Sequence, residues 1–458
     1  MTASDAHPPG ESSAAPIGRR IAPRPARLQR SAPRGGSHSY RRPPNVKLAA
    51  FSISCLLILM IAGPYMTLKT LPYTGEGSPL RQVIYIALFL CVAMAARVGD
   101  QPSRLLAIPF TLALTLGWCW LSLTWAVAPD VAVRRLLLTT IVIMSIFMAV
   151  DLIGSTRTLR LMRTILVLVL AVNYAAAVLA PSIGTHEAVS VEGFGLDPDL
   201  IGNWKGVLEQ KNFAGAVCAL TIMLFVFDAR AIPKWFRAAV IVASAYFLYR
   251  THAKTSFGIL AISIVAGAIF LTYNPRYRFL LFLGAAMTIF FTVTFGFIYW
   301  DAIAEPFRRP DAFTGRVQIW SVMMAYWQDH WLGSGYGSFW NVGDDSPLYR
   351  YTKTGSWVSL VAIGHNGYLD LLVQTGLPGL VLAIAAAVVA PLIKLFTSLK
   401  IPRQRGALLF AFQIFCAGHN LTETSLLDRD AIIQIMWMLT IAMIGVETRL
   451  RSAPRAHA

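Results

Sequence analysis

Long runs of apolar residues recur along this chain and are separated by short polar gaps. A helix needs about 20 apolar residues to cross a hydrocarbon core about 30 Å thick, so each run predicts one membrane span. The run 366–394 exceeds one span, and Pro378-Gly379 is expected to divide it into a short outer piece and a membrane piece. The pattern predicts an all-α polytopic membrane protein with about twelve transmembrane helices. The predicted spans are 48–69, 81–97, 105–127, 136–153, 162–181, 212–228, 236–250, 256–273, 278–299, 366–394, 406–422 and 431–447.

Basic residues fall mainly in alternate gaps and so predict how the chain is oriented. The formal net charge is +17, yet charged residues make up only 14% of the sequence, against about 25% in soluble domains. Eight arginines lie within residues 1–46. This placement favours an anionic membrane surface as the partner of the charge and argues against nucleic acid. We therefore expect a multi-pass protein with both termini in the cytoplasm.

Composition also suggests how the chain is divided. Residues 1–46 are rich in Pro, Ser, Ala and Arg, so we expect a disordered cytoplasmic tail, and they lack the apolar core of a signal peptide. Residues 47–300 hold the first nine predicted helices, and 301–365 form a large outer loop with short helices. Residues 366–447 hold the last three helices, and 448–458 form a second cytoplasmic tail.

Two outer-face gaps carry basic residues that are candidates for anion binding. Lys211 and Asn212 stand at the N-terminus of a predicted span, where free backbone N–H groups favour anions, although interfacial anchoring explains them as well. Arg250 and Lys254 lie in an outer gap, against the positive-inside rule. Either they snorkel at helix ends or they form an anion clamp at the outer leaflet.

The outer segment 301–364 holds the densest cluster of polar and aromatic residues. It contains Thr314-Gly315-Arg316 and then an apolar stripe that predicts a helix lying along the membrane surface. Three glycines interleaved with aromatic residues follow; such glycines suit a tight turn against a ligand, and the rings suit either stacking on sugars or an interfacial belt. The stripe is Ile319, Trp320, Met323, Met324 and Trp327. The glycine-aromatic stretch comprises Gly333, Gly335, Tyr336, Gly337, Phe339 and Trp340.

Two Gly-His-Asn sequences lie at the predicted outer face, at 364–366 and 418–420. His365 opens a span and is followed by Asn366 and Tyr368. An imidazole with the ordinary pKa of about 6.5 accepts a proton at neutral pH, which makes His365 a candidate base, whereas a lone histidine is more often structural. His419 ends another span and is followed by Glu423. This second pair is a weaker candidate, with helix packing as its alternative role.

Several classes of function lack their motifs in this sequence. It contains no HExxH, no P-loop and no CxxC, and its five cysteines lie within apolar runs, so neither a metal site nor a nucleotide site is predicted. The acidic pairs Asp197/Asp199 and Asp344/Asp345 have no supporting context for metal-dependent glycosyl transfer. A secondary transporter would place ionisable residues at mid-membrane, whereas here they crowd the outer face.

Taken together, the outer-face motifs resemble the O-antigen ligase and Wzy-type polysaccharide polymerase superfamily. Lys211-Asn212 and Lys254-Thr-Ser256 fit the same pattern, and the motifs cover roughly residues 200–380. The basic tail and the Lys-Thr-Ser variant are most similar to ExoQ-like exopolysaccharide polymerases. The resemblance rests on Thr314-Gly-Arg-x3-Trp320, Gly333-x-Gly335-x-Gly337 and His365-Asn366-x-Tyr368-Leu369-x4-Gln374-x-Gly376-Leu-Pro-Gly379.

The resemblance implies glycosyl transfer at the periplasmic face of the bacterial inner membrane. The donor would be a glycan on undecaprenyl pyrophosphate, and the acceptor a sugar hydroxyl on another lipid-linked unit or on a lipid A core. Chain-length regulators and export proteins are further partners that it allows. No metal or other cofactor is implied, because pyrophosphate is already an activated leaving group.

The resemblance also assigns roles to individual residues. His365 would be the general base, and Arg316 and Lys254 would neutralise the departing pyrophosphate, with Arg250 and Lys211 as helpers. The remaining residues expected to bind substrate are Asn212, Asn366, Tyr368 and Trp320.

Three functions stay open at this point. A polymerase of exopolysaccharide or O-antigen repeat units is the leading hypothesis, and a ligase that transfers finished glycan to a lipid A core is the first alternative. The alternative from a different class is a flippase or transporter of the lipid-linked unit. Two positions depart from the family pattern: Lys254 stands where arginine is common and gives a point charge in place of a bidentate fork, and Gln374 stands where glutamate is common.

Overall fold

The computed structural model describes residues 43–62, 78–186, 200–229, 231–305, 315–353 and 356–449. The predicted tail 1–46 lies outside these residues except for its last four, and only the first two residues of the tail 448–458 are described. Thr314, Asp197 and Asp199 are also outside the described residues. Met1–Pro43 and Pro44–Ala458 form separate units, and the fold described below is that of the second.

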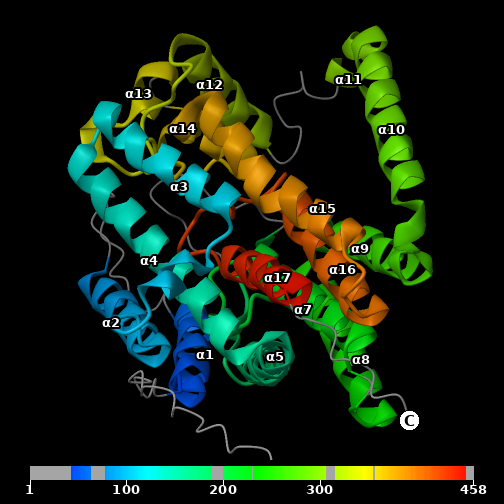
Figure 1. Cartoon of the computed structure of the whole chain (residues 1–458). Helices are drawn as coiled ribbons and strands as arrows, with labels where there is room; N and C mark the ends of the chain where they lie inside the picture. Colours follow the sequence, from blue (N-terminus) through cyan, green and yellow to red (C-terminus); the bar gives the residue numbers. More distant parts are fainter. Residues whose placement is uncertain are drawn as a thin grey trace, which may run out of the picture. The chain divides into compact units, whose positions relative to one another are not determined.

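Helices make up nearly all of the described chain, and each predicted span coincides with a helix or a helical run (Figure 1). The only extended pairing within the described residues is an isolated bridge between Thr185 and Trp204. The matching helices are α1 (Val46–Ala62), α2 (Pro79–Ala96), α3 (Phe110–Leu121), α4 (Pro129–Ile153), α5 (Ser155–Leu179), α7 (Lys211–Phe227), α8 (Lys234–Thr251), α9 (Lys254–Thr272), α10 (Arg278–Ile298), α14 (Gly367–Ile384), α15 (Ala390–Thr397), α16 (Arg403–His419) and α17 (Ile432–Arg449). The short helices are α6 (Pro181–Gly184), α11 (Trp300–Ala304), α12 (Arg316–Asp329) and α13 (Pro347–Tyr351).

Length and composition suit most of these helices to a membrane. Seven helical segments of the described chain are long and apolar enough to cross it, and they contain α2, α4, α5, α9, α10, α14 with α15, and α17. Helices α1, α3 and α7 lie in shorter apolar segments, whereas α8 and α16 begin with basic residues. The prediction of an all-α polytopic membrane protein is confirmed. The count of about twelve spans stays a prediction.

Helix α17 is the most enclosed of these segments, with 83% of its apolar window buried inside the protein, against 28% for α9. Helix α9 instead presents large apolar side chains such as Phe257 and Ile262 to the outside, as a helix in contact with lipid does. A glycine lets α9 approach its neighbours closely. A Cβ on Gly267 would lie 2.5 Å from Cζ of Phe227 and 3.1 Å from the carbonyl oxygen of Ala407.

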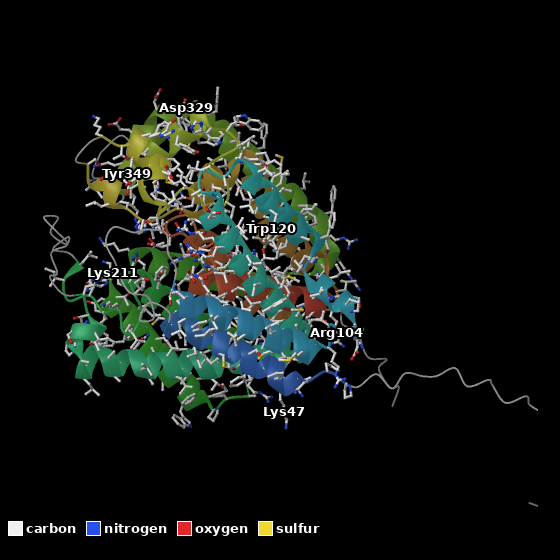
Figure 2. The ribbon with its side chains drawn as sticks, turned by 90° about the vertical axis from the view of Figure 1, so that its left-hand side faces the viewer. Lys47, Arg104, Trp120, Lys211, Asp329 and Tyr349 are labelled. Atoms are coloured by element: carbon white, nitrogen blue, oxygen red, sulfur yellow. The ribbon has the colours of Figure 1, made fainter. Side chains whose placement is uncertain are left out.

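The two ends of the bundle carry different segments. Figure 2 shows Lys47 and Arg104 towards one end, and Asp329 and Tyr349 of the long loop towards the opposite end. These ends correspond to the two sets of gaps that the sequence assigns to opposite faces of the membrane. The outer-loop acids Asp344 and Asp345 lie in an exposed 3-10 turn.

Helix α14 is broken near its middle, as its length predicted. Gly376 has a left-handed φ of +69° with ψ of −177°, and the break therefore lies two residues before Pro378. Pro378 has no N–H to continue the helical hydrogen bonds, and Gly376 supplies the backbone freedom that the turn requires. A π-helical turn, Ala385–Val389, then joins α14 to α15. The first half of α14 thus packs against α12, with Val373 and Leu369 in the same apolar cluster.

Helix α12 uses its apolar stripe in a way that the sequence did not predict. Ile319, Met323 and Tyr326 are buried in a second apolar cluster, and Trp320 and Trp327 pack against its edge. The rest of the cluster comes from the following loop and from α14, namely Phe339, Trp340, Leu348, Val358 and Val373. The expectation that the stripe lies on a membrane surface is therefore wrong, because those side chains pack against protein.

The break in α14 should be sensitive to any side chain at Gly376. A Cβ there would lie 2.5 Å from the carbonyl oxygen of Trp331, and a positive φ is strained for alanine. We expect Gly376→Ala to destabilise the fold by about 1–3 kcal/mol, measured by unfolding of the purified protein in detergent. Gly258→Ala is the control, because a Cβ at Gly258 meets nothing within 4 Å. Equal stability of the two variants would contradict the strained break.

Candidate active site

The carboxylate of Glu423 joins three side chains from distant parts of the chain. Glu423 lies in the loop between α16 and α17, and its side chain is only 1% exposed. Its Oε1 accepts hydrogen bonds from Nη2 of Arg316 at 2.7 Å and from Nδ2 of Asn212 at 2.6 Å. Its Oε2 lies 3.1 Å from Nδ1 of His365. Helices α7 and α12 and the start of α14 therefore meet at one buried acid.

The charge of Glu423 determines which ring nitrogen of His365 can accept a proton. Burial by itself would raise the pKa of the Glu423 carboxyl, but the hydrogen bond from His365 and the charge of Arg316 outweigh it and lower this pKa to about 2. An ionised carboxylate only accepts hydrogen bonds, so Nδ1 of a neutral His365 carries the proton. Its Nε2 is then a free proton acceptor. The side chain of His365 is 22% exposed, so a substrate can reach it.

The backbone holds His365 in an uncommon conformation. Its φ is +51°, in the left-handed region, which costs about 1–2 kcal/mol for a residue with a side chain. The preceding residue is fixed from two sides: the carbonyl of Gly364 accepts from Nε1 of Trp320 at 2.9 Å, and its N–H donates to Oδ1 of Asp370 at 3.2 Å. A Cβ on Gly364 would lie 2.6 Å from the same Oδ1. The surroundings thus impose the turn that presents the imidazole.

The residues after His365 start α14. The side chain of Asn366 caps the helix by accepting from the backbone N–H groups of Tyr368 and Leu369, both at 3.1 Å. The N–H of Gly367 donates to the carbonyl of Asn420 at 2.9 Å. The two Gly-His-Asn sequences therefore lie side by side, although more than 50 residues separate them in the chain.

Arg316 stands at the start of α12 and contacts the loop of Glu423 at two points. Its Nη2 pairs with Glu423, and its Nη1 donates to the carbonyl of Thr422. A guanidinium has five N–H donors in a fixed fork, so two acceptors do not use all of them. The side chain is 19% exposed. The structure therefore brings the predicted cation and the predicted base to the same carboxylate.

Two residues of this arrangement, Arg316 and His365, fall within a segment that matches a known family. Residues 238–384 match the family model described as O-antigen ligase (Wzy_C). We call this matched segment the O-antigen ligase domain. The superfamily predicted from the motifs is thereby confirmed, while the finer likeness to ExoQ-like polymerases stays a prediction. No curated protein matches the chain.

The O-antigen ligase domain supplies His365 and Arg316, but their shared partner Glu423 lies beyond it, as does Asn212. Asn212 reaches the cluster because the starts of α7 and α9 are in contact: Oγ of Ser256 donates to the carbonyl of Asn212 at 3.4 Å. Lys254 is exposed at the start of α9, two residues before Ser256. Next to Asn212, the backbone N–H of Lys211 donates to Nε2 of His186 at 3.2 Å.

Arg250 of the O-antigen ligase domain is engaged elsewhere. Its guanidinium carbon lies 4.5 Å from the ring centroid of Trp204, and an N–H donates to the hydroxyl of Tyr246 at 3.4 Å. A cation on an aromatic face is held in place by the ring quadrupole. These contacts of Arg250 favour the alternative of a side chain that snorkels at a helix end, and none of them reaches Glu423.

The remaining candidates pack the site together. The hydroxyl of Tyr368 donates to the carbonyl of Ala417 at 2.9 Å and so ties α14 to α16. His419 is fully buried, and its ring stacks on Phe415 with centroids 5.6 Å apart. These contacts favour the helix-packing role of His419. Of the weaker candidates His419 and Glu423, the residue that reaches the predicted base is therefore Glu423.

The sequence analysis missed Asp370, a second buried carboxylate beside the O-antigen ligase motif. Its Oδ1 accepts from Nε1 of Trp340 at 2.6 Å, and its Oδ2 accepts from the hydroxyl of Thr424. The side chain is 1% exposed. An acidic residue within a predicted span is a signal that sequence alone offered. Asp370 and Glu423 together hold the segment that carries His365 against the loop between α16 and α17.

The lowered pKa of Glu423 predicts how stability depends on pH. Because the pKa falls from 4.5 to about 2 on folding, the carboxylate stabilises the fold fully above about pH 4.5. This contribution, about 3 kcal/mol, is lost as the pH falls towards about 2. We expect Glu423→Gln to be less stable than the wild type at neutral pH and to lose less stability on acidification.

Unfolding of the purified protein in detergent between about pH 7 and about pH 3 checks this expectation. Glu209→Gln is the matched control, because Glu209 is exposed and precedes the same helix α7. A Glu423→Gln variant that loses stability with falling pH as steeply as the wild type would show that the buried carboxylate is not the titrating group.

Proposed function

We propose that this protein is a periplasmic-face glycosyltransferase that polymerises undecaprenyl-pyrophosphate-linked oligosaccharide repeat units into exopolysaccharide or O-antigen. The O-antigen ligase domain supports a membrane polysaccharide polymerase or ligase. The observation that carries the finer proposal is the pairing of His365 with the ionised Glu423 beside Arg316. A base and a cation at one carboxylate are what this transfer requires.

In the proposed reaction, Nε2 of His365 takes the proton of an acceptor hydroxyl. The hydroxyl oxygen forms a bond to the anomeric carbon of the donor sugar as the bond from that carbon to the pyrophosphate oxygen breaks. The departing pyrophosphate keeps the electron pair. Glu423 stabilises the imidazolium that forms, because its carboxylate already accepts from Nδ1. Such base assistance contributes about 10²–10⁴-fold.

Arg316 and Lys254 neutralise the developing charge of the pyrophosphate in this proposal. Preorganised cations are most effective where water is scarce, as at the membrane surface. The spare N–H donors of Arg316 suit a phosphate oxygen, and Lys254 adds a point charge from the exposed start of α9. The reaction needs neither metal nor nucleotide, since the lipid pyrophosphate is itself the leaving group.

The proposal includes an orientation. The long loop 301–365 and the start of α14 face the periplasm of a bacterial inner membrane, and both termini are cytoplasmic. The separation of Lys47 and Arg104 from Asp329 and Tyr349 supports it, because basic residues collect on the cytoplasmic side. A ligase acting on a lipid A core is the second candidate, because the matched family is described as O-antigen ligase.

Removal of the proposed base should abolish chain extension. We expect His365→Ala to lower transfer by about 10²–10⁴-fold, while the protein still inserts and lipid-linked repeat units accumulate outside. His365→Asn is the companion variant, because asparagine tolerates a left-handed backbone. Polymer length on gels and the lipid-linked pool are the measurements.

His252→Ala is the matched control, since His252 has the same φ of +51° and is exposed at the end of α8. Normal polymer length in the His365 variants would sink the catalytic role. Repeat units trapped on the cytoplasmic leaflet would instead indicate a transporter, and finished polymer left on the lipid carrier would indicate a ligase.

The fork of Arg316 should matter as well as its charge. We expect Arg316→Lys to lose at least about tenfold in activity, because an ammonium does not reproduce the paired contacts to Thr422 and Glu423, and Arg316→Ala to lose more. Arg350→Ala, on an exposed arginine of the same loop, is the control. Full activity in both Arg316 variants would argue that no pyrophosphate is gripped there.

A further inference from the structure

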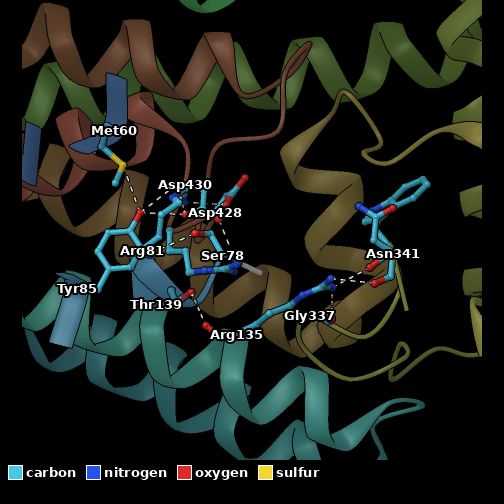
Figure 3. A network of polar contacts seen from close by, with 12 residues as sticks. Met60, Ser78, Arg81, Tyr85, Arg135, Thr139, Gly337, Asn341, Asp428 and Asp430 are labelled. Carbon is cyan, nitrogen blue, oxygen red and sulfur yellow. Dashed lines mark hydrogen bonds and ion pairs between the residues drawn. The ribbon is translucent and has the colours of Figure 1, made fainter. Parts of the chain in front are cut away.

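A cavity of about 210 Å³ lies beside the proposed base. Its walls come from α4, the glycine-rich loop 336–341, the first half of α14 and the loop 424–430. Figure 3 shows Arg135 of α4 extending towards Gly337 and Asn341, with Asp428 and Asp430 gathered near Arg81 and Tyr85. The cavity has no role in the reaction described so far.

The cavity and the base share two short stretches of chain. Ile363, two residues before His365, lines the cavity, and so does Thr424, which directly follows Glu423. Asp370 also lines it and holds the N–H of Gly364. A ligand in this cavity is therefore held by the same segments that position the imidazole.

The charges around the cavity do not suit a pyrophosphate. Arg135 is used by the loop: it donates to the carbonyls of Gly337 at 2.6 Å, Trp340 at 2.7 Å and Asn341 at 3.0 Å. Arg429 pairs with Asp430 at 3.1 Å. Arg81, just outside the lining, also pairs with Asp430 at 2.6 Å. Three acids line the cavity, namely Asp370, Asp428 and Asp430. An anion would meet these acids while the arginines around them are already engaged.

The free polar groups instead suit a ring with hydroxyl groups. Oε1 of Gln374 accepts from the N–H of Gly337 at 2.7 Å, which leaves its NH₂ group for a ligand. The side-chain amide of Asn341 has no protein partner among the described residues, and its backbone has a left-handed φ of +53°, which asparagine tolerates. Trp340 and Tyr336 supply aromatic walls beside these amides.

The volume of the cavity limits the size of the ligand that it can hold. Pockets for drug-sized ligands usually measure about 300–1,000 Å³, and this cavity is smaller. It fits one sugar ring rather than a complete repeat unit. Aromatic walls, two amides and a carboxylate around such a volume are the groups that bind a sugar through stacking and hydrogen bonds.

We propose that this cavity binds the terminal sugar of the acceptor glycan, apart from the site of the donor pyrophosphate at Arg316. The proposal rests on the proposed function, and it assigns to Asn341, Gln374 and Asp428 the recognition of an uncharged or cationic sugar. Glycine-rich spacing in the loop then serves acceptor binding, because Gly337 and Asn341 both line the cavity.

Binding to the purified full-length protein in lipid nanodiscs tests the proposal. The probes are the host's own repeat-unit oligosaccharide released from its lipid by mild acid, the oligosaccharide of the lipopolysaccharide core, and inorganic pyrophosphate. We expect one of the two oligosaccharides to bind, and Asn341→Gly and Asp428→Asn each to weaken that binding about tenfold through loss of a hydrogen bond. Pyrophosphate should not compete.

The variants are chosen to keep the fold. Glycine adopts the positive φ of residue 341 without strain and keeps the carbonyl that Arg135 binds, and asparagine keeps the oxygen of residue 428 that accepts from the N–H of Asp430. Arg97→Gly is the matched control, since Arg97 has the same φ of +53° and lies outside the cavity lining. In transfer assays, Asn341→Gly should raise the KM for the acceptor and leave kcat and the KM for the donor nearly unchanged.

Several results would overturn the cavity assignment. These are no binding of either oligosaccharide to the wild type, wild-type binding by both Asn341→Gly and Asp428→Asn, or competition by pyrophosphate. The assignment fails independently of the function, because His365→Ala should still bind the oligosaccharide while it no longer transfers. Full activity of His365→Ala would sink the function, and the binding measurement would still decide what the cavity holds.

Discussion

A single buried carboxylate organises the end of the protein that carries α12 and the start of α14. Glu423 has its charge away from water, and such a charge is stable only when hydrogen bonds and cations surround it. Arg316, Asn212 and His365 meet this requirement, and they come from three elements that are far apart in the chain. The need to satisfy one acid therefore fixes where α7, α12 and the start of α14 meet. The same contact sets the tautomer of the imidazole, so the constraint of the fold is also the constraint of the proposed chemistry.

The residues around Glu423 and the residues around the cavity differ in the cations that they leave available. Around Glu423, Arg316 has donors left over, and Lys254 is exposed nearby on α9. Around Asp370 and Asp428, the guanidinium of Arg135 already donates hydrogen bonds to carbonyl groups of the glycine-rich loop. The proposed transfer joins an anionic donor to a hydroxyl acceptor. If cations were available throughout the site, pyrophosphate could also bind where the acceptor has to bind, so the two regions need different charges. Asp370 stands between the two regions and contacts both.

Lipid explains why the spans were predictable and the site was only partly so. Every backbone group of a span must bond within its own helix, so apolar run length located the helices, and run length together with Pro378 indicated the break in 366–394. Side-chain partners follow no such local rule. The sequence around Arg250 is the same whether its side chain binds an anion or stacks on Trp204, so sequence alone could not decide between the two. Glu423 reads as an ordinary loop acid, because its partner His365 is 58 positions away. The apolar stripe on α12 packs against protein residues such as Phe339. Its spacing in the sequence could not show whether lipid or protein would cover it.

The position of Glu423 in the chain has a consequence for biosynthesis. Asn212, Arg316 and His365 are all made and inserted before the loop between α16 and α17 emerges from the ribosome. Until that loop arrives, the arginine lacks its counter-charge and the imidazole has no acceptor for its Nδ1 proton. Only one helix, α17, follows within the described chain, and it is the most enclosed in the protein. The contacts that complete the proposed site therefore form only late in synthesis, together with the packing of α17.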